Sequence, residues 1–474
     1  MDHQTTIFDM LYPKYKITKP VRLITLFSGY DSQALALKYL GVEYEHWKTC
    51  EWAVKSIQAL KDIHFEEDIK DYSKDLEIGQ IKEFLFNKGI SSNYNEPMSM
   101  AQINRLNDKQ VRTIYNNIQA THNLVNIQQV KGSDLEIVDK DKYDYILTYS
   151  FPCQDLSLAG KGKGMSDTST RSGMLWEVER ILSECKELDS LPQILLMENV
   201  PQVHGEGNVE DFNKWQLRLE ELGYKNYFED LIATDYGIPQ TRNRCFMVSI
   251  LGDYSYTFPK PIPLKLKLKD LLEDNIDEKY YISDKMLQGM INTNFNSYKL
   301  ESRLQDLDGA IDTLLTSSGS RCPHCIPIKN NTKKGYLEAT DGDGVDISSR
   351  MEHHRGTVQK DKAQTLTTQC DIGVVIEKDN YYQWYQKGYL EHDTRAWKEE
   401  KVSETLCTRG STKVATNNLR IRKLTPRECF RLMGVKDGDF DKVKKNQSDS
   451  SLYHLAGDSI VVNVLMAIFK ELLW

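Results

Sequence analysis

Three separate stretches of the chain carry side chains that could act on a bound substrate. Cys153 follows a proline at the end of YDYILTYSFPCQ, Glu198 ends the apolar run of QILLMENV, and Arg242 and Arg244 precede an apolar run. A thiolate can attack an electrophilic carbon, a buried carboxyl can donate a proton, and a guanidinium can stabilise a developing oxyanion. Any one of these residues is more often structural than reactive, because a reactive thiol needs a lowered pKa and exposure. Their common position at predicted strand ends favours one shared site.

The elements that would position these residues alternate between strands and helices. VRLITLFSG (21–29) predicts a strand and a tight turn, and a helical pattern follows. HWKTCEW (46–52) predicts a second strand with an acidic residue about 20 residues after the turn, where nucleotide-binding units hold a ribose. Further strands at 143–154, 193–200 and 244–251 alternate with helices. We therefore expect an α/β fold with a doubly wound, mostly parallel sheet, whose reactive groups lie beyond the carboxyl ends of the strands.

Composition divides the chain further. Its 474 residues exceed the size at which single cores stop growing, so two domains are expected. Within a catalytic domain over residues 20–261, the polar segment 70–135 predicts a helical insertion. Residues 262–420, rich in Thr, Ser, Asn and Gly, predict a smaller, loop-rich domain. Residues 421–474 return to helical patterning and should fold back onto the catalytic domain.

Hydropathy, cysteine spacing and net charge limit the cellular location and the binding partners that the sequence allows. We find no apolar run of the roughly 18–20 residues that span a membrane, which predicts a cytoplasmic protein. Nine cysteines without dense spacing predict reduced thiols. The net charge of −8 argues mildly against indiscriminate nucleic-acid binding, although basic residues gather at 260–269, 329–334 and 409–431.

Short motifs in a fixed order link these stretches, and together they resemble the cytosine-5 DNA methyltransferase family. The motifs, in chain order, are LFSG (26–29), Glu51-Trp52, Asp68-Ile69, PCQ (152–154), RSG (171–173), ENV (198–200), DYGIPQTRNR (235–244), TPRECFRLMG (425–434) and AGDSIVVNV (456–464).

The resemblance implies a Rossmann-like domain that uses S-adenosyl-methionine and methylates carbon 5 of cytosine in a specific short DNA sequence. Cys153 would add to carbon 6 of a base flipped out of the duplex, Glu198 would act at nitrogen 3, and Arg244, with Arg242 beside it, would stabilise the carbonyl oxygen. It also implies a bacterial or phage enzyme of restriction-modification type. Its partners would be double-stranded DNA, which it would bind as a monomer, and, where the enzyme protects DNA from a restriction nuclease, the cognate restriction endonuclease that acts on the same site.

The remaining site residues are also implied by the resemblance. Two departures from the family pattern stand out: Tyr30, Asp31 and Ser32 replace a glycine-rich turn, and Asp458 stands where asparagine is usual. Residues 262–420 would be the target-recognition domain. The cofactor would be held by Phe27, Ser28, Gly29, Glu51, Trp52, Asp68, Ile69, Pro152, Asp458, Ser459 and Ile460. DNA would be contacted by Gln154, Ser157, Arg171, Gln240 and Arg427.

Alternatives remain open at this point. An RNA cytosine methyltransferase is disfavoured by the long second domain, and an inactive paralogue by the intact Cys153, Glu198 and Arg244. CPHC (322–325) has the spacing of half a zinc site, but one such pair also suits a loop with two free thiols. Methyl transfer itself requires no metal, and we expect none.

Overall fold

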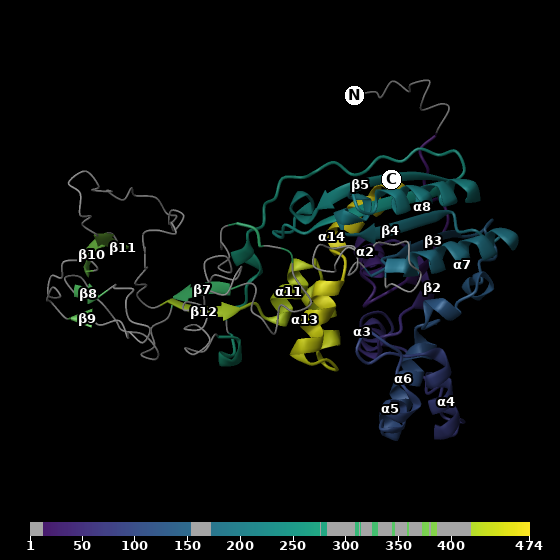
Figure 1. Ribbon diagram of the computed structural model, residues 1–474, viewed down its shortest axis with the longest axis horizontal. Helices are drawn as coiled ribbons and strands as arrows, with labels where there is room; N and C mark the ends of the chain where they lie inside the picture. Colours follow the sequence, from purple (N-terminus) through teal and green to yellow (C-terminus); the bar gives the residue numbers. More distant parts are fainter. Residues whose placement is uncertain are drawn as a thin grey trace. The chain divides into compact units, whose positions relative to one another are not determined.

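The computed structural model describes residues 13–152, 172–274, 276–281, 309–311, 313 and 419–474, together with the strands β7 to β11 between residues 325 and 385 (Figure 1). Cys153, Gln154, Ser157 and Arg171 lie outside the described residues. The chain divides into two compact units. Unit 1 comprises Met1–Ile276, Gln305–His324 and Leu424–Trp474, and unit 2 comprises Asp277–Leu304 and Cys325–Lys423.

A six-stranded sheet forms the centre of unit 1. Its strands lie in the order β2-β1-β3-β4-β6-β5. The first four are parallel, and β6 runs antiparallel to both β4 and β5. This arrangement confirms the predicted doubly wound, mostly parallel α/β sheet. The bounds are β1 (Val21–Leu26), β2 (Tyr44–Cys50), β3 (Asp144–Tyr149), β4 (Ile194–Asn199), β5 (Tyr224–Ile232) and β6 (Asn243–Leu251).

Helices cover the central strands, which explains why their sequences are continuous apolar runs. Every residue of β1, β3 and β4 is buried, as expected for parallel strands that are covered on both faces. Alternate residues of these strands form one core with α7 (Leu175–Glu187) and α8 (Val209–Leu222). Helix α2 (Ser32–Leu40) packs against α14 (Val462–Leu473), and the two lie side by side at the sheet (Figure 1).

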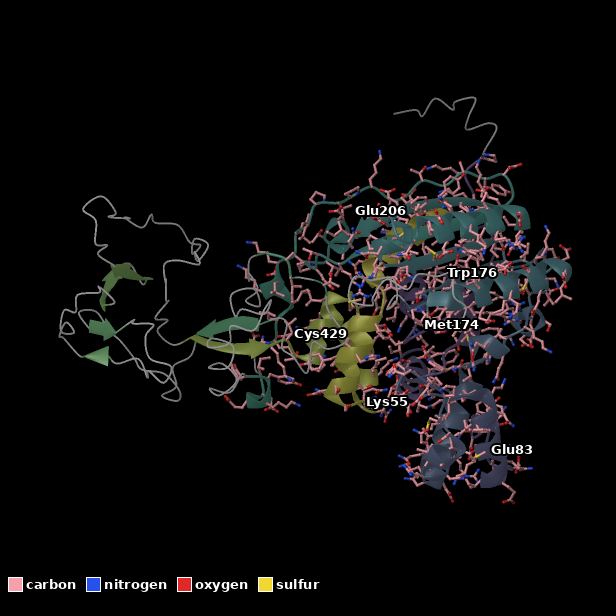
Figure 2. All side chains as sticks on the ribbon, viewed as in Figure 1. Lys55, Glu83, Met174, Trp176, Glu206 and Cys429 are labelled. Carbon is pink, nitrogen blue, oxygen red and sulfur yellow. The ribbon has the colours of Figure 1, made fainter. Side chains whose placement is uncertain are left out.

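The predicted helical insertion is present as three helices with a core of their own. These are α4 (Ile78–Lys88), α5 (Met100–Asn104) and α6 (Asp108–Ala120), and they pack around buried aliphatic residues. The insertion is joined to the sheet through α3 (Val54–His64) and through Ser91, whose N–H donates to the Trp52 carbonyl over 2.7 Å. Glu83 of α4 lies on the part of the insertion that projects away from the sheet (Figure 2). The base of the insertion therefore adjoins the end of β2.

The C-terminal part of unit 1 contains four helices, within the residues 421–474 for which sequence analysis expected helical patterning. These are α11 (Pro426–Leu432), α12 (Asp437–Lys444), α13 (Asp449–Asp458) and α14. The stretch Asp449–Leu473 has a mean hydropathy of 1.6 over its most apolar window, enough to span a membrane by composition. Our expectation that no such stretch exists is therefore wrong on composition. Because 72% of that window is buried inside the protein, and because α13 and α14 are separate helices, we interpret it as core.

In unit 2, the described elements are short antiparallel strands. Strand β10 (Ile372–Lys378) pairs with β11 (Tyr381–Tyr385) and β8 (Gly344–Asp346), and β8 also pairs with β9 (Val358–Gln359). Separately, β7 (Cys325–Lys329) pairs with β12 (Leu419–Lys423). That residues 262–420 act as a domain for target recognition remains a prediction.

Candidate active site

Glu198 and Arg244 meet at one end of the central sheet. Glu198 is near the end of β4, Arg244 is the second residue of β6, and the two strands pair antiparallel, so the end of one adjoins the start of the other. Arg244 Nε lies 3.1 Å from Glu198 Oε1. Burial raises the pKa of the Glu198 carboxyl, and the nearby Asp458 adds to the rise, whereas Arg244 and Arg242 oppose it. The Glu198 carboxyl can therefore stay protonated at a higher pH than an ordinary glutamate does.

The backbone that leads to Cys153 is attached to the same strand end. Strand β3 ends at Tyr149, and the carbonyl of Phe151 accepts a 3.0 Å hydrogen bond from Asn199 Nδ2. Asn199 directly follows Glu198 and is itself buried. It therefore ties the chain two residues before Cys153 to the strand that carries Glu198. The half-buried Pro152 is the last described residue of this segment.

Arg242 has a different task from Arg244. It is almost fully buried, and its Nη2 donates to the Gly457 carbonyl over 3.1 Å and to the Ser459 carbonyl over 2.8 Å. These carbonyls lie at the junction of α13 and α14. Arg242 therefore holds the C-terminal segment to the sheet, a role that the spacing of the two arginines did not reveal.

The turn after β1 brings Gly29 to Glu51. The Gly29 N–H donates to Glu51 Oε2 over 2.9 Å, and the Ala53 N–H donates to Glu51 Oε1 over 2.7 Å. Burial raises the pKa of Glu51 to about 7, although these two hydrogen bonds oppose the rise. Gly29 has φ +56°, and an added Cβ would meet no atom within 4 Å. Space for a ligand thus adjoins the turn.

The other two residues of the turn serve its shape. Phe27 has φ 58° and packs partly against the core. Ser28 is buried: its hydroxyl donates to the Thr25 carbonyl over 2.8 Å and accepts from the Cys50 N–H over 3.1 Å. Ser28 therefore joins β1 to β2, and its contacts within the protein account for its side chain.

Asp31, the first departure from the glycine-rich pattern, occupies a backbone conformation that favours glycine. Its φ is 62°, and its side chain caps α2 by accepting from the Ala34 N–H over 3.0 Å. Thr25 Oγ1 donates to the same carboxylate over 3.0 Å, and His46 Nε2 lies 3.0 Å from it. Aspartate tolerates this left-handed region better than most residues. These contacts hold the turn in shape without the usual glycine.

Three of the predicted cofactor-binding residues, Trp52, Asp68 and Ile69, lie near the insertion. Trp52 is half-buried and packs against the insertion core. Asp68 accepts hydrogen bonds from the Lys70 N–H and the Tyr72 hydroxyl, and the side chain of Ile69 is 92% exposed. Protein atoms therefore leave the Ile69 side chain open to a ligand or to solvent.

Residues near the C-terminal end of the chain contact the turn after β1. Ser459 Oγ donates to the Tyr30 hydroxyl over 2.8 Å, and Ile460 is buried. Asp458 interacts electrostatically with Glu51 and Glu198. Burial raises the pKa of Asp458 to about 6, against the opposing effect of Arg242 and Arg244. Residues from both ends of unit 1 therefore surround one region.

Two of the predicted DNA contacts are occupied within unit 1. Gln240 is fully buried, and its Nε2 donates to the Leu432 carbonyl over 2.8 Å. Arg427 forms ion pairs with Glu273 at 3.1 Å and with Asp441 at 2.5 Å. Both placements favour a structural role over contact with DNA, because each side chain already satisfies protein groups.

Asn123 is a site residue that sequence reasoning missed. Its Oδ1 accepts from the Glu51 N–H over 3.0 Å, and its Nδ2 donates to the Glu51 carbonyl over 2.9 Å. It follows α6 of the insertion, 72 residues after Glu51, and nothing in its local sequence marks it. Asn199, by contrast, was signalled by its place beside Glu198.

One group among the described residues has metal-ligand chemistry. The ligand atoms of His204, Asp230 and Cys245 all lie within 4.8 Å of one another. His204 Nε2 is already 2.9 Å from Asp230 Oδ1, and burial raises the pKa of the Cys245 thiol. Since the thiolate is the form that binds metals, this arrangement favours a plain hydrogen bond between His204 and Asp230 beside a neutral thiol.

The site has clear counterparts among known proteins. A model of the family described as C-5 cytosine-specific DNA methylase matches residues 89–474. The Type II methyltransferase M2.ScrFI of Lactococcus lactis subsp. cremoris is 30% identical over 456 residues, covering 95% of this chain and 99% of that protein. The Orphan methyltransferase M.SssI of Spiroplasma monobiae is 36% identical over 287 residues, covering 60% of this chain and 71% of that protein.

Two solved structures share the fold. The methyltransferase EhMeth of Entamoeba histolytica aligns with a TM-score of 0.53 at 12% identity, over 96% of this chain and 98% of its own. A mutant DNMT2 of Spodoptera frugiperda aligns with a TM-score of 0.52 at 15% identity, over 95% of this chain and 99% of its own. At such identities the likeness concerns the fold alone.

Proposed function

Because this chain belongs to the C-5 cytosine-specific DNA methylase family, we propose that it methylates cytosine through a transient covalent adduct of Cys153 with a base flipped out of the duplex. The activity itself, DNA cytosine-5 methylation, follows from the family. The observation that carries the proposed mechanism is the buried Glu198–Arg244 pair at the strand end that Asn199 ties to the segment before Cys153.

S-adenosyl-methionine is the methyl donor that we propose, and it supplies an electrophilic methyl group when bound. The residues beside the turn suit it. Gly29 leaves open space, Glu51 could accept from the ribose hydroxyls, and Trp52, Asp68 and Ile69 would hold the adenine. Phe27, Pro152 and the segment 458–460 would complete the pocket. A Glu51 carboxylate that retains proton affinity near neutral pH suits a hydrogen-bonding partner of hydroxyl groups.

The proposed reaction begins with the Cys153 thiolate. A bond forms between its sulfur and carbon 6 of cytosine, and the displaced electron pair moves towards nitrogen 3 and the carbonyl oxygen. Glu198, whose pKa is raised by burial, donates a proton to nitrogen 3. Arg244 orients Glu198 and stabilises the charge that develops on the oxygen.

Carbon 5 then carries the electron density needed to bond to the methyl group, whose bond to the donor sulfur would break as the new bond forms. Loss of the proton on carbon 5 to water restores the double bond and breaks the bond between the cysteine sulfur and carbon 6, which frees the Cys153 thiolate. The proton on nitrogen 3 returns to the Glu198 carboxylate. A cytosine inside a duplex cannot reach the end of the sheet, so the base must first leave the stack, at a cost of a few kcal/mol.

We propose that residues 262–420 read the target sequence. M2.ScrFI, a relative of this chain, carries the name of a Type II methyltransferase, and we extend a restriction-modification role to this chain on that basis. A cognate endonuclease acting on the same site, binding to duplex DNA as a monomer and a cytoplasmic location belong to the same proposal.

Bisulfite sequencing of a plasmid from cells that express the protein tests both the reaction and its specificity. We expect methylated cytosines within one short motif, lost with Cys153→Ser and retained with the matched control Cys185→Ser, whose thiol is buried on α7. Soluble protein with an unmethylated plasmid would contradict the proposal. Transfer of a labelled methyl group to tRNA but not to DNA would then point to the RNA alternative, and cofactor binding without transfer to either would point to an inactive paralogue.

A further inference from the structure

Asp458 is the second departure from the family pattern, and its carboxylate has no partner among the described residues. It accepts no hydrogen bond there and forms no ion pair there, and the residue is exposed to solvent. Its position is nevertheless fixed, because the carbonyls of its two neighbours, Gly457 and Ser459, both accept from Arg242. Ser459 also binds the Tyr30 hydroxyl in the turn after β1.

The charges around Asp458 come from several elements and are mostly committed elsewhere. Arg242 is bound to the two carbonyls, and Arg244 is paired with Glu198. Glu51, which follows β2, repels the Asp458 carboxylate, since each of the two carboxylates disfavours ionisation of the other. Among the described residues, other titratable groups near this region are Glu198, Tyr30, which is hydrogen-bonded to Ser459, and Tyr94 of the insertion, which interacts electrostatically with Asp458. The ring of His454 lies 4.0 Å from that of Tyr94 in a tilted arrangement.

A fixed carboxylate that forms no ion pair with a described protein cation suits a cationic ligand group, and Arg242 and Arg244 nearby favour its ionised form. The proposed donor offers one: its sulfur is a sulfonium with a full positive charge, whereas the product S-adenosyl-homocysteine has a neutral thioether. All other groups of the two molecules are the same. A carboxylate near the sulfur would attract the donor and not the product, which the neutral amide of an asparagine could not do.

We propose that the Asp458 carboxylate selects the cationic methyl donor over its neutral product. The inference rests on the proposed function, because it assumes that S-adenosyl-methionine binds beside Gly29 and Glu51. Its consequence is weaker retention of product after each turnover, since the methyl group and the positive charge leave together.

Calorimetric titration of the DNA-free protein with each of the two ligands tests the inference, and no turnover is needed. We expect Asp458→Asn to lower the ratio of the product Kd to the donor Kd by about fivefold to tenfold, a Coulombic effect of one charge in a partly solvated pocket. Asp458→Glu should keep most of the selectivity. The control Asp253→Asn removes the same charge from an exposed loop and should leave the ratio unchanged.

The ratio should also depend on pH in one direction. Lowering the pH from 8 to about 5 protonates Asp458, whose pKa burial raises to about 6, so wild-type selectivity should fall while that of Asp458→Asn stays flat. Protonation of Glu51 affects contacts that both ligands share, and the effects of Glu198, Tyr94 and His454 persist in the variant. They therefore cancel in the comparison.

The outcomes separate this inference from the proposed function. Tight binding of both ligands with a ratio that Asp458→Asn does not change overturns the inference and leaves the function standing. Failure of the folded wild-type protein to bind either ligand overturns both. Thermal melting of each variant verifies that it is folded, and Asn is close in size to Asp.

Discussion

Glu198 and Arg244 form a largely buried ion pair, and the location of one proton in it matters for the reaction that we propose. Burial favours the neutral carboxyl of Glu198, whereas the neighbouring guanidinium favours the carboxylate. Because burial and the guanidinium act on the same carboxyl in opposite directions, Glu198 can hold a proton and still donate it. A glutamate in water would have lost that proton at neutral pH.

Replacing Glu198 with Gln should lower the rate of methyl transfer by about 10²- to 10⁴-fold, the usual contribution of a positioned proton donor. Donor binding should remain, because the Glu51 pocket is unaltered. The wild-type advantage should shrink as the pH rises through the raised pKa of Glu198, since the glutamate then loses its proton whereas Gln remains a neutral hydrogen-bond donor. Single-turnover methylation between pH 6 and 10 measures both effects.

The control for this variant is Glu206→Gln, an exposed carboxylate labelled in Figure 2. It should leave the rate unchanged. A full-rate Glu198→Gln enzyme would show that nitrogen 3 receives its proton from another group.

At the scale of elements, the insertion reaches the site through Asn123, which holds both backbone groups of Glu51. Asn123→Ala should lower the free energy of unfolding by about 1–3 kcal/mol, because it leaves buried backbone groups unpaired. It should also weaken donor binding, because Glu51 would lose its fixed position. Urea unfolding and calorimetric titration measure the two effects.

Asn116→Ala, which removes a hydrogen bond to Asp71 on the exposed side of α6, serves as the matched control. We expect only a small loss of stability and unchanged donor binding. Equal effects of the two variants on binding would show that the insertion supports the fold but not the pocket.

Sequence patterns predicted the elements whose residues share one environment, such as complete burial. Strands β1, β3 and β4 are buried throughout, so each appears in the sequence as a continuous apolar run. Strand β5 was missed because it lies at the sheet edge and its residues 229–230 are exposed, which blurs the strand pattern. Helix α12 has no clear apolar stripe in its sequence, because it is eight residues long and mostly charged.

The site divides in the same way. Glu198 and the Gly29–Glu51 contact lie at the carboxyl ends of parallel strands, where the expected sheet places them. Arg244 precedes most of β6 and reaches Glu198 because β6 runs antiparallel to β4, which the local sequence does not show. The roles of Arg242 and Asn123 depend on partners 215 or more and 72 residues away in the sequence. Such partners are set by tertiary packing, which a local pattern does not encode.

For the whole molecule, the end of the chain completes a core that its beginning starts. Helix α14 buries six aliphatic or aromatic side chains and packs on α2. Loss of a single large core side chain costs about 2–5 kcal/mol, against a total stability of about 5–15 kcal/mol for a domain. Unit 1 therefore depends on α14 for folding.

Deleting residues 462–474 should abolish soluble expression of unit 1, because the deletion uncovers the α2 side of the core. Removing only Trp474, which is 67% exposed, should leave the melting temperature and the yield nearly unchanged. The soluble fraction and the thermal melting of both truncations provide the measurement. Soluble, cooperatively melting protein from the longer deletion would contradict this dependence.

The contact between Ser459 and Tyr30 spans 429 residues of sequence, and this span sets a delay during synthesis. At about 5–20 residues per second, a ribosome needs roughly 20–90 s to make the segment between them. Throughout that interval the turn after β1 exists without the residues that close its pocket. On the proposed mechanism, we therefore expect a partly made chain to leave DNA unmodified until the ribosome has added helices α13 and α14.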